Sequence, residues 1–319
     1  MTDRRFDRES TAEEVSAGID LSGRHAIVTG ASSGLGTETA RALALRGASV
    51  TLACRDLEAG REIAEKIRAG TGQSAVDVMA LDLTRPDRIR DFAKGFAAEH
   101  DALHLLINNA GVMACPLART ERGWEMQFGT NHMGHFLLTC LLAPQLVAGA
   151  PARVVNLSSA GHRFSGVDFD DPNYEHRDYD TWEAYGQIKT ANVLFSVELN
   201  RRLAGRGVEA FAVHPGGIMT KLGRHLEQAD IEELMSRAPG GKGIQWKTVE
   251  QGAATSVWAA TAPELDGRGG LYLEDCRIAQ PKQSDDQDGG YADYAVDAES
   301  ARRLWALSEE LLGESFPLD

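Results

Sequence analysis

The amino-acid sequence predicts one doubly wound α/β domain, in which helices flank a mainly parallel sheet of seven strands. From Arg24 onward, short apolar runs alternate with longer amphipathic segments. A glycine-rich turn joins the first apolar run to the first amphipathic segment, and no linker or internal repeat divides the 319 residues. Strands that alternate with helices in this way form parallel βαβ units, and six or seven such strands make one domain.

The first part of the chain contains four expected strands and three expected helices. Each strand is a short apolar run, which is typical of a strand buried on both faces. Gly47 closes the first helix and Gly70 the second, while Pro86 suits the first turn of the third. The strands are residues 26–29, 49–53, 76–81 and 103–107, and the helices are residues 37–46, 57–68 and 86–100.

The remainder of the chain continues the alternation. The expected strands are residues 153–157, 208–213 and 271–273, and the expected helices are residues 134–147, 182–203, 249–260 and 298–312. Residues 281–290 are polar, acidic and contain glycine, so we expect an exposed loop there. The domain therefore spans residues 21–319, with a substrate lid at about residues 220–247 and a C-terminal extension.

Residues 1–20 form a polar extension before the domain. Thr11 and Glu14 have the spacing of a helix capping box, which predicts a short helix packed on the surface of the fold. The extension lacks the apolar stretch of a secretory signal. The longest apolar run, residues 136–143, is too short to span a bilayer.

Composition narrows the classes of partner. The formal net charge of −14 has the wrong sign for neutralising nucleic-acid phosphates or an anionic membrane surface. The four cysteines are scattered, without a CxxC pair, which argues against a zinc site and a disulfide framework. We therefore expect a cytoplasmic protein with no nucleic-acid partner and no metal. The cysteines are Cys54, Cys115, Cys140 and Cys276.

The glycine-rich turn, residues 29–36, has the context of a dinucleotide-binding site, between a strand and a helix. Gly30 permits the tight turn, Gly34 lets the backbone approach a pyrophosphate, and Gly36 lets helix and strand pack closely. The N-terminus of the helix then directs N–H groups at the phosphates. The turn therefore predicts a Rossmann-type nicotinamide cofactor site that includes Ser32, Ser33 and Leu35.

Arg55 stands at the end of the second strand, where a side chain usually lies near the adenosine ribose. An acidic residue there would accept a hydrogen bond from the 2′-hydroxyl of NAD(H), whereas a forked guanidinium suits the 2′-phosphate of NADP(H). NADP(H) is therefore the predicted cofactor, with NAD(H) as the alternative. In the other interpretation, Arg55 is a solvated surface residue and Asp56 caps the next helix.

An ordered set of motifs resembles the short-chain dehydrogenase/reductase family. After the glycine turn, the set comprises Asp82-Leu83, Asn108-Asn109-Ala110-Gly111, Asn131, Ser158-Ser159, Tyr185-xxx-Lys189 and Pro215-Gly216. Residues 54–56 and 131–136 resemble the retinol dehydrogenase and WW-domain oxidoreductase branch in particular. The motifs cover roughly the first two-thirds of the chain, and such an ordered set is far more specific than any single motif.

The resemblance implies hydride transfer between the nicotinamide and a carbonyl or alcohol, with four catalytic residues. Tyr185 and Lys189 share one helix face, so the ammonium can favour the phenolate of a general acid/base. Ser159 would polarise the substrate oxygen, since the resemblance aligns the second serine with the catalytic one. Neighbouring strand residues point to opposite faces, so only one of the two serines should reach the site. Asn131 would bind a water that extends the proton relay; its other interpretation is a helix cap.

Further residues would surround the cofactor on this resemblance. Lys189 would also bind the nicotinamide ribose, and Thr220 would contact the cofactor after the Pro215-Gly216 motif. The expected cofactor-binding set is Gly30, Ser32, Ser33, Gly34, Leu35, Gly36, Arg55, Asp82, Leu83, Asn109, Ala110, Gly111, Tyr185, Lys189, Pro215, Gly216, Ile218 and Thr220.

Two other functions are weighed against this one. A binding protein that senses NADP(H) without turnover would be favoured by a missing Tyr or Lys, and both are present. An epimerase or dehydratase of sugar nucleotides would need a larger C-terminal substrate domain than the residues after Gly217 provide. An oxidoreductase acting on CH–OH or C=O groups is therefore the predicted class.

Ser159 and Tyr185 are separated by an acidic insertion, residues 165–181. Its side chains could form a metal loop, but the spacing and central glycine of an EF-hand are absent, so we expect a solvated loop on the substrate side. His132 and His135 lack matching ligands at a recognisable spacing, which favours packing or capping. The acidic and histidine residues of the insertion are Asp168, Asp170, Asp171, His176, Asp178 and Asp180.

The substrate pocket is expected to be mostly apolar, which fits bulky alkyl, terpenoid, steroid or aromatic carbonyls. Gly223 and residues 239–241 are candidate hinges of the lid. The family resemblance implies a homodimer or homotetramer through the long helices, which the C-terminal extension could support or block. The expected pocket residues are Met113, Phe164, Trp182, Met219, Leu222 and Trp246.

The Arg55 hypothesis predicts that Arg55→Asp weakens the binding of NADPH more than that of NADH. Only NADPH carries the 2′-phosphate that the new carboxylate would repel. Fluorescence titration with each nucleotide measures both affinities, and an unchanged preference would mean that another group reads the 2′-phosphate.

Overall fold

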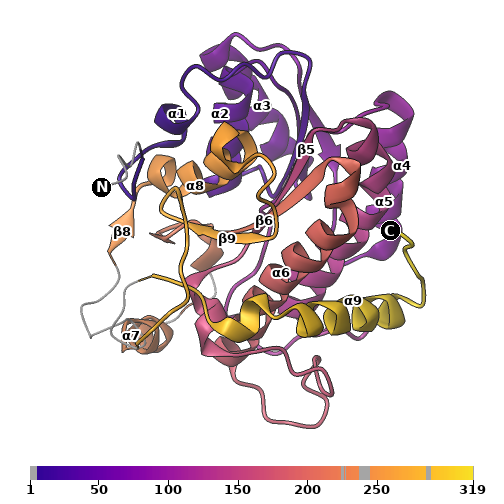
Figure 1. Cartoon of the computed structure of the whole chain (residues 1–319), viewed down its shortest axis with the longest axis vertical. Helices are drawn as coiled ribbons and strands as arrows, with labels where there is room; N and C mark the ends of the chain where they lie inside the picture. Colours follow the sequence, from indigo (N-terminus) through magenta and orange to yellow (C-terminus); the bar gives the residue numbers. More distant parts are fainter. Residues whose placement is uncertain (1–5, 224–225, 227, 237–244, 285–288, 319) are drawn as a thin grey trace.

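The computed structural model of the chain describes residues 6–223, 226, 228–236, 245–284 and 289–318. It forms one layer of sheet between two layers of helices, which confirms the predicted doubly wound α/β class (Figure 1). The expected hinge at residues 239–241 lies outside the described residues.

The main sheet has eight strands in the order β10-β9-β6-β5-β4-β1-β2-β3. All neighbouring pairs are parallel except β9 and β10. The prediction of seven strands missed the two-residue β10, which is too short to produce an alternating pattern. The strands are β1 (His25–Thr29), β2 (Ser49–Cys54), β3 (Val76–Ala80), β4 (Leu105–Asn108), β5 (Ala152–Leu157), β6 (Val208–His214), β9 (Leu271–Glu274) and β10 (Arg277–Ile278).

The expected helices are present with shifted ends. Residues 34–36 already belong to α2, and Gly72, with a φ of 74°, closes α3 where Gly70 was expected. The helices are α1 (Ala12–Val15), α2 (Gly34–Leu45), α3 (Leu57–Thr71), α4 (Pro86–Glu99), α5 (Gly134–Ala148), α6 (Thr181–Leu203), α7 (Gln228–Ser236), α8 (Val249–Thr261) and α9 (Ala298–Leu312). A second small sheet pairs β7 (Gly217–Ile218) with β8 (Trp246–Lys247).

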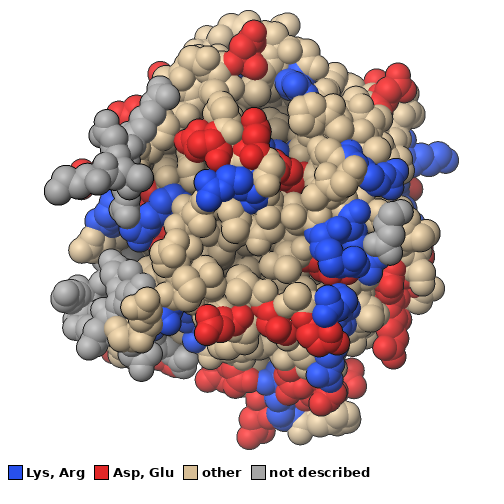
Figure 2. Space-filling model, viewed as in Figure 1, with Lys and Arg blue, Asp and Glu red and all other residues tan. Residues whose placement is uncertain are grey.

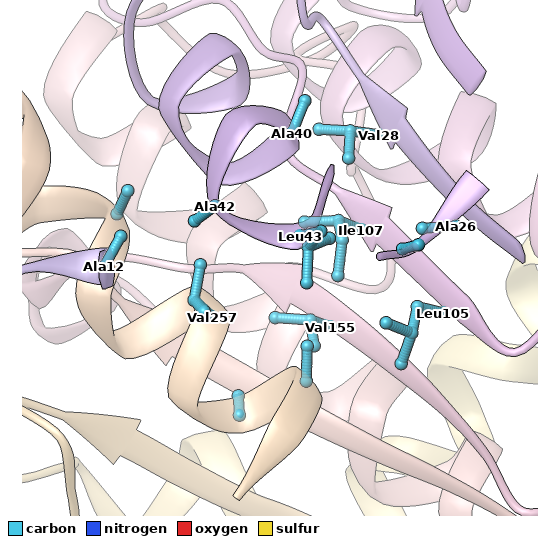
Figure 3. Packing of buried hydrophobic residues seen from close by; sticks show 14 of the residues in the cluster. Ala12, Ala26, Val28, Ala40, Ala42, Leu43, Leu105, Ile107, Val155 and Val257 are labelled. Atoms are coloured by element: carbon cyan, nitrogen blue, oxygen red, sulfur yellow. The ribbon is translucent and has the colours of Figure 1, made fainter. Parts of the chain in front are cut away.

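The side chains of each central strand point alternately to the two faces of the sheet, so the hydrophobic core has two halves, one on each face. Val28 of β1 faces the cluster formed with α1, α2, α3 and α8, whereas its neighbour Ile27 faces the cluster formed with α4, α5, α6 and α9. Figure 3 shows the first half, where Leu43 of α2 and Val257 of α8 lie over the strand residues. Successive side chains on a strand point to opposite faces, so each central strand is buried on both.

The extension before the domain folds as expected at Thr11. The Thr11 side chain accepts a hydrogen bond from the backbone N–H of Glu14, and the Glu14 carboxylate accepts one from the Thr11 backbone N–H, which completes the capping box. Ala12 and Val15 are buried in the core half that contains α2 and α8.

The C-terminal helix α9 packs along α6, as Figure 1 shows. Trp305 of α9 is buried against Phe136 of α5 and Phe195 of α6, with ring centroids 4.8 Å and 6.0 Å away. Part of the α6 surface that was expected to form an assembly contact is therefore covered by the chain's own C-terminal extension.

The structure shows the lengths of the helices and the distribution of charge on one face. No described helix has the length and apolar character needed to cross a bilayer. On the described part of the face in Figure 2, basic side chains stand in separate groups among acidic ones.

The packing of Trp305 predicts that Trp305→Ala destabilises the fold by about 3–5 kcal/mol, because truncating a buried aromatic side chain loses transfer free energy and leaves a cavity. Urea unfolding measures the change. The exposed neighbour Arg302 supplies the control, since Arg302→Ala should change stability by only about 0.5 kcal/mol. A loss below about 1 kcal/mol for Trp305→Ala would mean that α9 contributes little to the core.

Candidate active site

A cavity of about 860 Å³ opens at the carboxyl ends of the central strands, where ligands bind in doubly wound sheets. The glycine turn, the loops after β2, β3, β4, β5 and β6, and helix α7 all line it. The structure therefore brings together all the expected cofactor-binding segments around one space. Every residue of the expected cofactor-binding set lines this cavity except Gly36.

The glycine turn has the geometry that a dinucleotide needs. Gly30 and Gly34 have positive φ values of 67° and 59°, where a side chain would be strained. A Cβ at Gly36 would lie 2.6 Å from the side-chain nitrogen of Asn109 and 2.7 Å from the backbone oxygen of Gly30, so only glycine allows this approach. Ser33, the N-cap of α2, makes no side-chain cap, which leaves the first N–H groups of the helix for a phosphate. The turn thus fits the pyrophosphate of a nicotinamide dinucleotide.

Thr29 and His135 link the glycine turn to the loop after β4. The backbone N–H groups of Asn109 and Ala110 both donate to Thr29 Oγ1 at 2.9 Å. His135 Nδ1 lies 2.9 Å from the carbonyl oxygen of Asn131, which can only accept, so Nδ1 carries the proton. Burial lowers the pKa of His135 to about 4, so the neutral ring accepts from the Thr29 hydroxyl through Nε2 at 2.9 Å.

Asn131 lies in a π-helical turn, Phe128–Met133, directly before α5. Its side-chain oxygen accepts from the N–H of Val112 and its amide donates to the carbonyl of Val112, both at 2.8 Å. The amide thus holds the loop after β4, and the residue is not the helix cap of the other interpretation. Its role in binding a water that extends the proton relay stays a prediction.

The loops after β2 and β3, which were expected to lie near the adenosine, line the cavity. Arg55 is exposed at the cavity edge, directly after β2. Asp56 accepts from the backbone N–H of Ala59 at 3.0 Å and so caps α3. Asp82 accepts from the N–H and the hydroxyl of Thr84, at 3.0 and 2.7 Å, which fixes the turn after β3.

Tyr185 and Lys189 lie one turn apart on α6, with the Lys189 Nζ 5.5 Å from the Tyr185 ring centre. Lys189 donates to the carbonyl of Leu157 at 3.0 Å, and Asn192 donates to the same oxygen at 2.9 Å. Both bonds fasten α6 to the end of β5. The Ser159 side chain lies close to the phenol of Tyr185 and acts to lower its pKa.

The two serines after β5 point in different directions, as expected from their alternation. Ser158 donates to the backbone carbonyl of Lys189 at 2.8 Å, so it holds α6. Ser159 accepts from the N–H of Gly161 at 3.1 Å and reaches Tyr185. Gly161 is needed there, since a Cβ would lie 2.8 Å from the Tyr185 ring.

Burial shifts both ionisable groups toward their neutral forms. It raises the pKa of Tyr185 to about 12, with the Ser159 side chain acting in the opposite direction. It lowers the pKa of Lys189 to about 8. At neutral pH the lysine is therefore mostly an ammonium beside a protonated phenol, the arrangement in which a tyrosine can donate a proton.

Sequence reasoning missed three side chains beneath the loop after β6. Lys247 and Asp275 form a half-buried ion pair at 2.6 Å, and the stem of Lys247 fills the space that a Cβ at Gly216 would occupy. His214 Nδ1 accepts from the N–H groups of Ala160 and Gly216, at 3.2 and 3.4 Å. These contacts hold the Pro215-Gly216 loop, but no local motif marks them because β8 and β9 lie far from β6 in the sequence.

The cavity is lined in part by apolar side chains. Of the expected pocket residues, Met113, Phe164, Met219, Leu222 and Trp246 line it. Trp182 does not line it; its ring is buried behind Tyr185, at 6.1 Å between ring centres, because it begins α6 on the core side. Helix α7 within the expected lid adds Ile231, Leu234 and Met235 to the lining.

The acidic insertion is held by ion pairs. The guanidinium of Arg177 lies within ion-pair distance of Asp168, Asp171 and Glu183, and Arg303 of α9 pairs with Asp170. Asp170, Asp178 and Asp180 are exposed, as expected of a solvated loop. The ion pairs were not predicted: Arg177 lies within the insertion, and Arg303 lies far from it in the sequence. No group of three or more potential metal ligands occurs within the described ranges.

His132 is a packing residue, as expected. It lies among aromatic rings of α5 and α6, and its Nε2 is 2.8 Å from the hydroxyl of Ser308 in α9. The four cysteines form no disulfide, and all four are buried.

Comparison with known proteins places this site in a family. A family model described as short chain dehydrogenase matches residues 24–231. Retinol dehydrogenase 12 of Mus musculus is 44% identical over 296 residues, covering 92% of this chain and 88% of that protein. The WW domain-containing oxidoreductase of Pongo abelii is 39% identical over 321 residues, covering 98% of this chain and 74% of that protein.

Solved structures are similar as well. An uncharacterized protein from Mycobacterium paratuberculosis is 36% identical, with a TM-score of 0.74 over 95% of this chain and 98% of that one. A gluconate 5-dehydrogenase from Burkholderia cenocepacia, solved with NADP and tartrate, is 25% identical, with a TM-score of 0.64 over 80% of this chain and 94% of that one.

The buried histidines predict that stability falls on acidification. Burial lowers the pKa of His132 to about 3, and those of His135 and His162 to about 4. In the unfolded chain these histidines bind protons near pH 6.5, whereas in the folded chain they bind them only at much lower pH. Stability should therefore fall between about pH 6.5 and 4, by about 1.4 kcal/mol per pH unit for each such histidine.

Urea unfolding at about pH 7, 6 and 5 measures this slope. His132→Phe should make this slope shallower by about 1.4 kcal/mol per pH unit, because it removes one histidine whose pKa is lowered in the folded state. A wild-type stability that does not change over this range would contradict the prediction.

Proposed function

The chain belongs to the short-chain dehydrogenase family and is an oxidoreductase acting on CH–OH or C=O groups; from that premise we propose an NADP(H)-dependent reaction on a mainly apolar substrate. Tyr185 is its general acid and base. The observation that carries this proposal is the grouping of Ser159, Tyr185 and Lys189 in one wall of the cavity that the glycine turn also lines.

The proposed chemistry divides the work between cofactor and protein. The bound nicotinamide supplies or accepts the hydride. During reduction, Ser159 and Tyr185 hydrogen-bond to the carbonyl oxygen, and Tyr185 gives its proton to that oxygen as negative charge develops. The Lys189 ammonium lowers the free energy of the resulting phenolate. During oxidation the same phenolate removes the proton of the alcohol.

The proposed cofactor orientation follows the sheet. The glycine turn holds the pyrophosphate, the loops after β2 and β3 hold the adenosine, and Ile218 and Thr220 lie toward the nicotinamide half. Arg55 is the proposed partner of the 2′-phosphate, since its forked donors match a phosphate. The NADP bound to the related gluconate 5-dehydrogenase supports a nicotinamide cofactor in this fold.

The proposed substrate is a bulky apolar alcohol or carbonyl. Its support is the lining of methionine, leucine and aromatic side chains beside Tyr185, to which α7 contributes. The names of the retinol dehydrogenase relatives also point to an apolar alcohol. A cytoplasmic location and a homodimer or homotetramer stay predictions from the sequence.

The central test is Tyr185→Phe. Removing the hydroxyl should lower kcat by about 10²–10⁴, because proton transfer to and from the substrate oxygen is lost. The affinity for NADPH, measured by fluorescence titration, should stay near that of the wild type. Tyr294→Phe is the control, since that ring is partly exposed and its hydroxyl bonds to the backbone of His162. Full activity in Tyr185→Phe would overturn the assignment.

A further inference from the structure

Arg8 stands outside every motif considered so far, yet it lines the same cavity. It belongs to the segment before α1, which lies outside the matched family region, residues 24–231. The segment is a tight turn, in which the N–H of Ser10 donates to the carbonyl of Asp7 at 3.3 Å. Gln251 of α8 donates to the backbone carbonyl of Glu9 at 3.2 Å, which ties the turn to the domain.

The guanidinium of Arg8 is held in place by Gln245. Its Nη1 donates to the side-chain oxygen of Gln245, and its Nη2 donates to the backbone oxygen at 3.3 Å. These bonds account for two of the five N–H donors of a guanidinium. Gln245 directly precedes β8, whose Trp246 pairs with Gly217 of β7. Arg8 is thereby fixed to the strand pair that leads into Thr220.

This strand pair lies against the N-terminus of α2. A Cβ placed on Gly34 would be 3.5 Å from the side chain of Thr220. A Cβ on Gly252 would be 2.6 Å from Ile218 and 2.7 Å from Leu35, so β7, α8 and the start of α2 meet at one point. Arg8 thus joins the cavity lining from the β8 side and Arg55 from the end of β2, and the glycine turn lines the same cavity.

Three of the described arginines line the cavity: Arg8, Arg55 and Arg163. Arg163 donates to the backbone oxygens of Ala160 and Gly289, which hold it on the catalytic side of the site. The chain carries a formal net charge of −14, while a nicotinamide dinucleotide is an anion. Lys247 is neutralised by Asp275, and Lys189 lies beneath Tyr185 at the catalytic wall. Within the part of the chain that the structure describes, no carboxylate pairs with Arg8 at 4.0 Å or less. Its positive charge is thus available to the cavity.

We propose that Arg8 binds the pyrophosphate of the cofactor, so that the segment before the domain contributes a phosphate ligand to the site. The inference rests on the proposed cofactor function and adds a residue to it. Charge-assisted bonds from a guanidinium to phosphate oxygens are strong and directional. The pyrophosphate is common to NADPH and NADH, so Arg8 should strengthen the binding of both cofactors equally. Arg55, by contrast, should strengthen the binding of NADPH alone.

Isothermal titration of the full chain tests this role by binding alone. Arg8→Ala should lower the affinities for NADPH and NADH by a similar factor, about tenfold. It should also lower the affinity for ADP-ribose, which contains the pyrophosphate. The affinity for adenosine 2′-phosphate, which lacks the pyrophosphate, should not change. Arg8→Lys should recover part of the affinity, and the loss should shrink as salt concentration rises. The matched control is Arg61→Ala, an exposed arginine of α3 outside the cavity.

Each outcome has one meaning. Equal affinity of wild type and Arg8→Ala for ADP-ribose would overturn the inference, as would a loss confined to NADPH. Failure of the wild-type chain to bind any nicotinamide nucleotide would instead contradict the proposed function. If Arg8→Ala unfolds, shown by its circular dichroism, the comparison passes to Arg8→Gln, which keeps the side-chain length and polarity.

Discussion

The bond from the buried ammonium of Lys189 to the carbonyl of Leu157 joins the two elements on which the site depends. Leu157 ends β5, and the serines that follow it take their direction from that strand. Lys189 belongs to α6, which carries Tyr185 one turn earlier. Burying a charge is costly unless it is well bonded, so this contact tolerates little displacement of the helix. The positions of Ser159 and Tyr185 relative to each other follow from it.

The sequence predicted the parts of the fold that depend on local patterns. Alternating apolar and amphipathic runs located the central strands and the major helices, and the glycine turn located the cofactor end of the sheet. Helix boundaries were less well placed at α2 and α3, since a glycine can begin a helix as well as close one. The short strands β7, β8 and β10 produce too few residues for a periodic signal.

The site was predicted where the family motifs are contiguous and missed where it is assembled from distant segments. Tyr185, Lys189 and Ser159 come together as expected. The contacts of Lys247, Asp275 and His214 join β6, β8 and β9, and the link from Thr29 through His135 to Asn131 joins β1 to the turn before α5. Such pairings depend on the three-dimensional path of the chain. Trp182 shows the opposite error: it was expected to line the substrate pocket because it is bulky and close to Tyr185 in sequence, but its side chain is buried in the core.

The order of the strands has a consequence for how the chain reaches this state. β1 is hydrogen-bonded to β4, so that Ala26 pairs with Leu105 and the glycine turn meets the loop after β4 only through a contact between distant segments. Contacts of this kind require long loops to close first, which slows folding. Nucleotide can therefore bind only after the centre of the sheet has formed. Bound cofactor would stabilise the finished fold by mass action and leave the rate of reaching it unchanged.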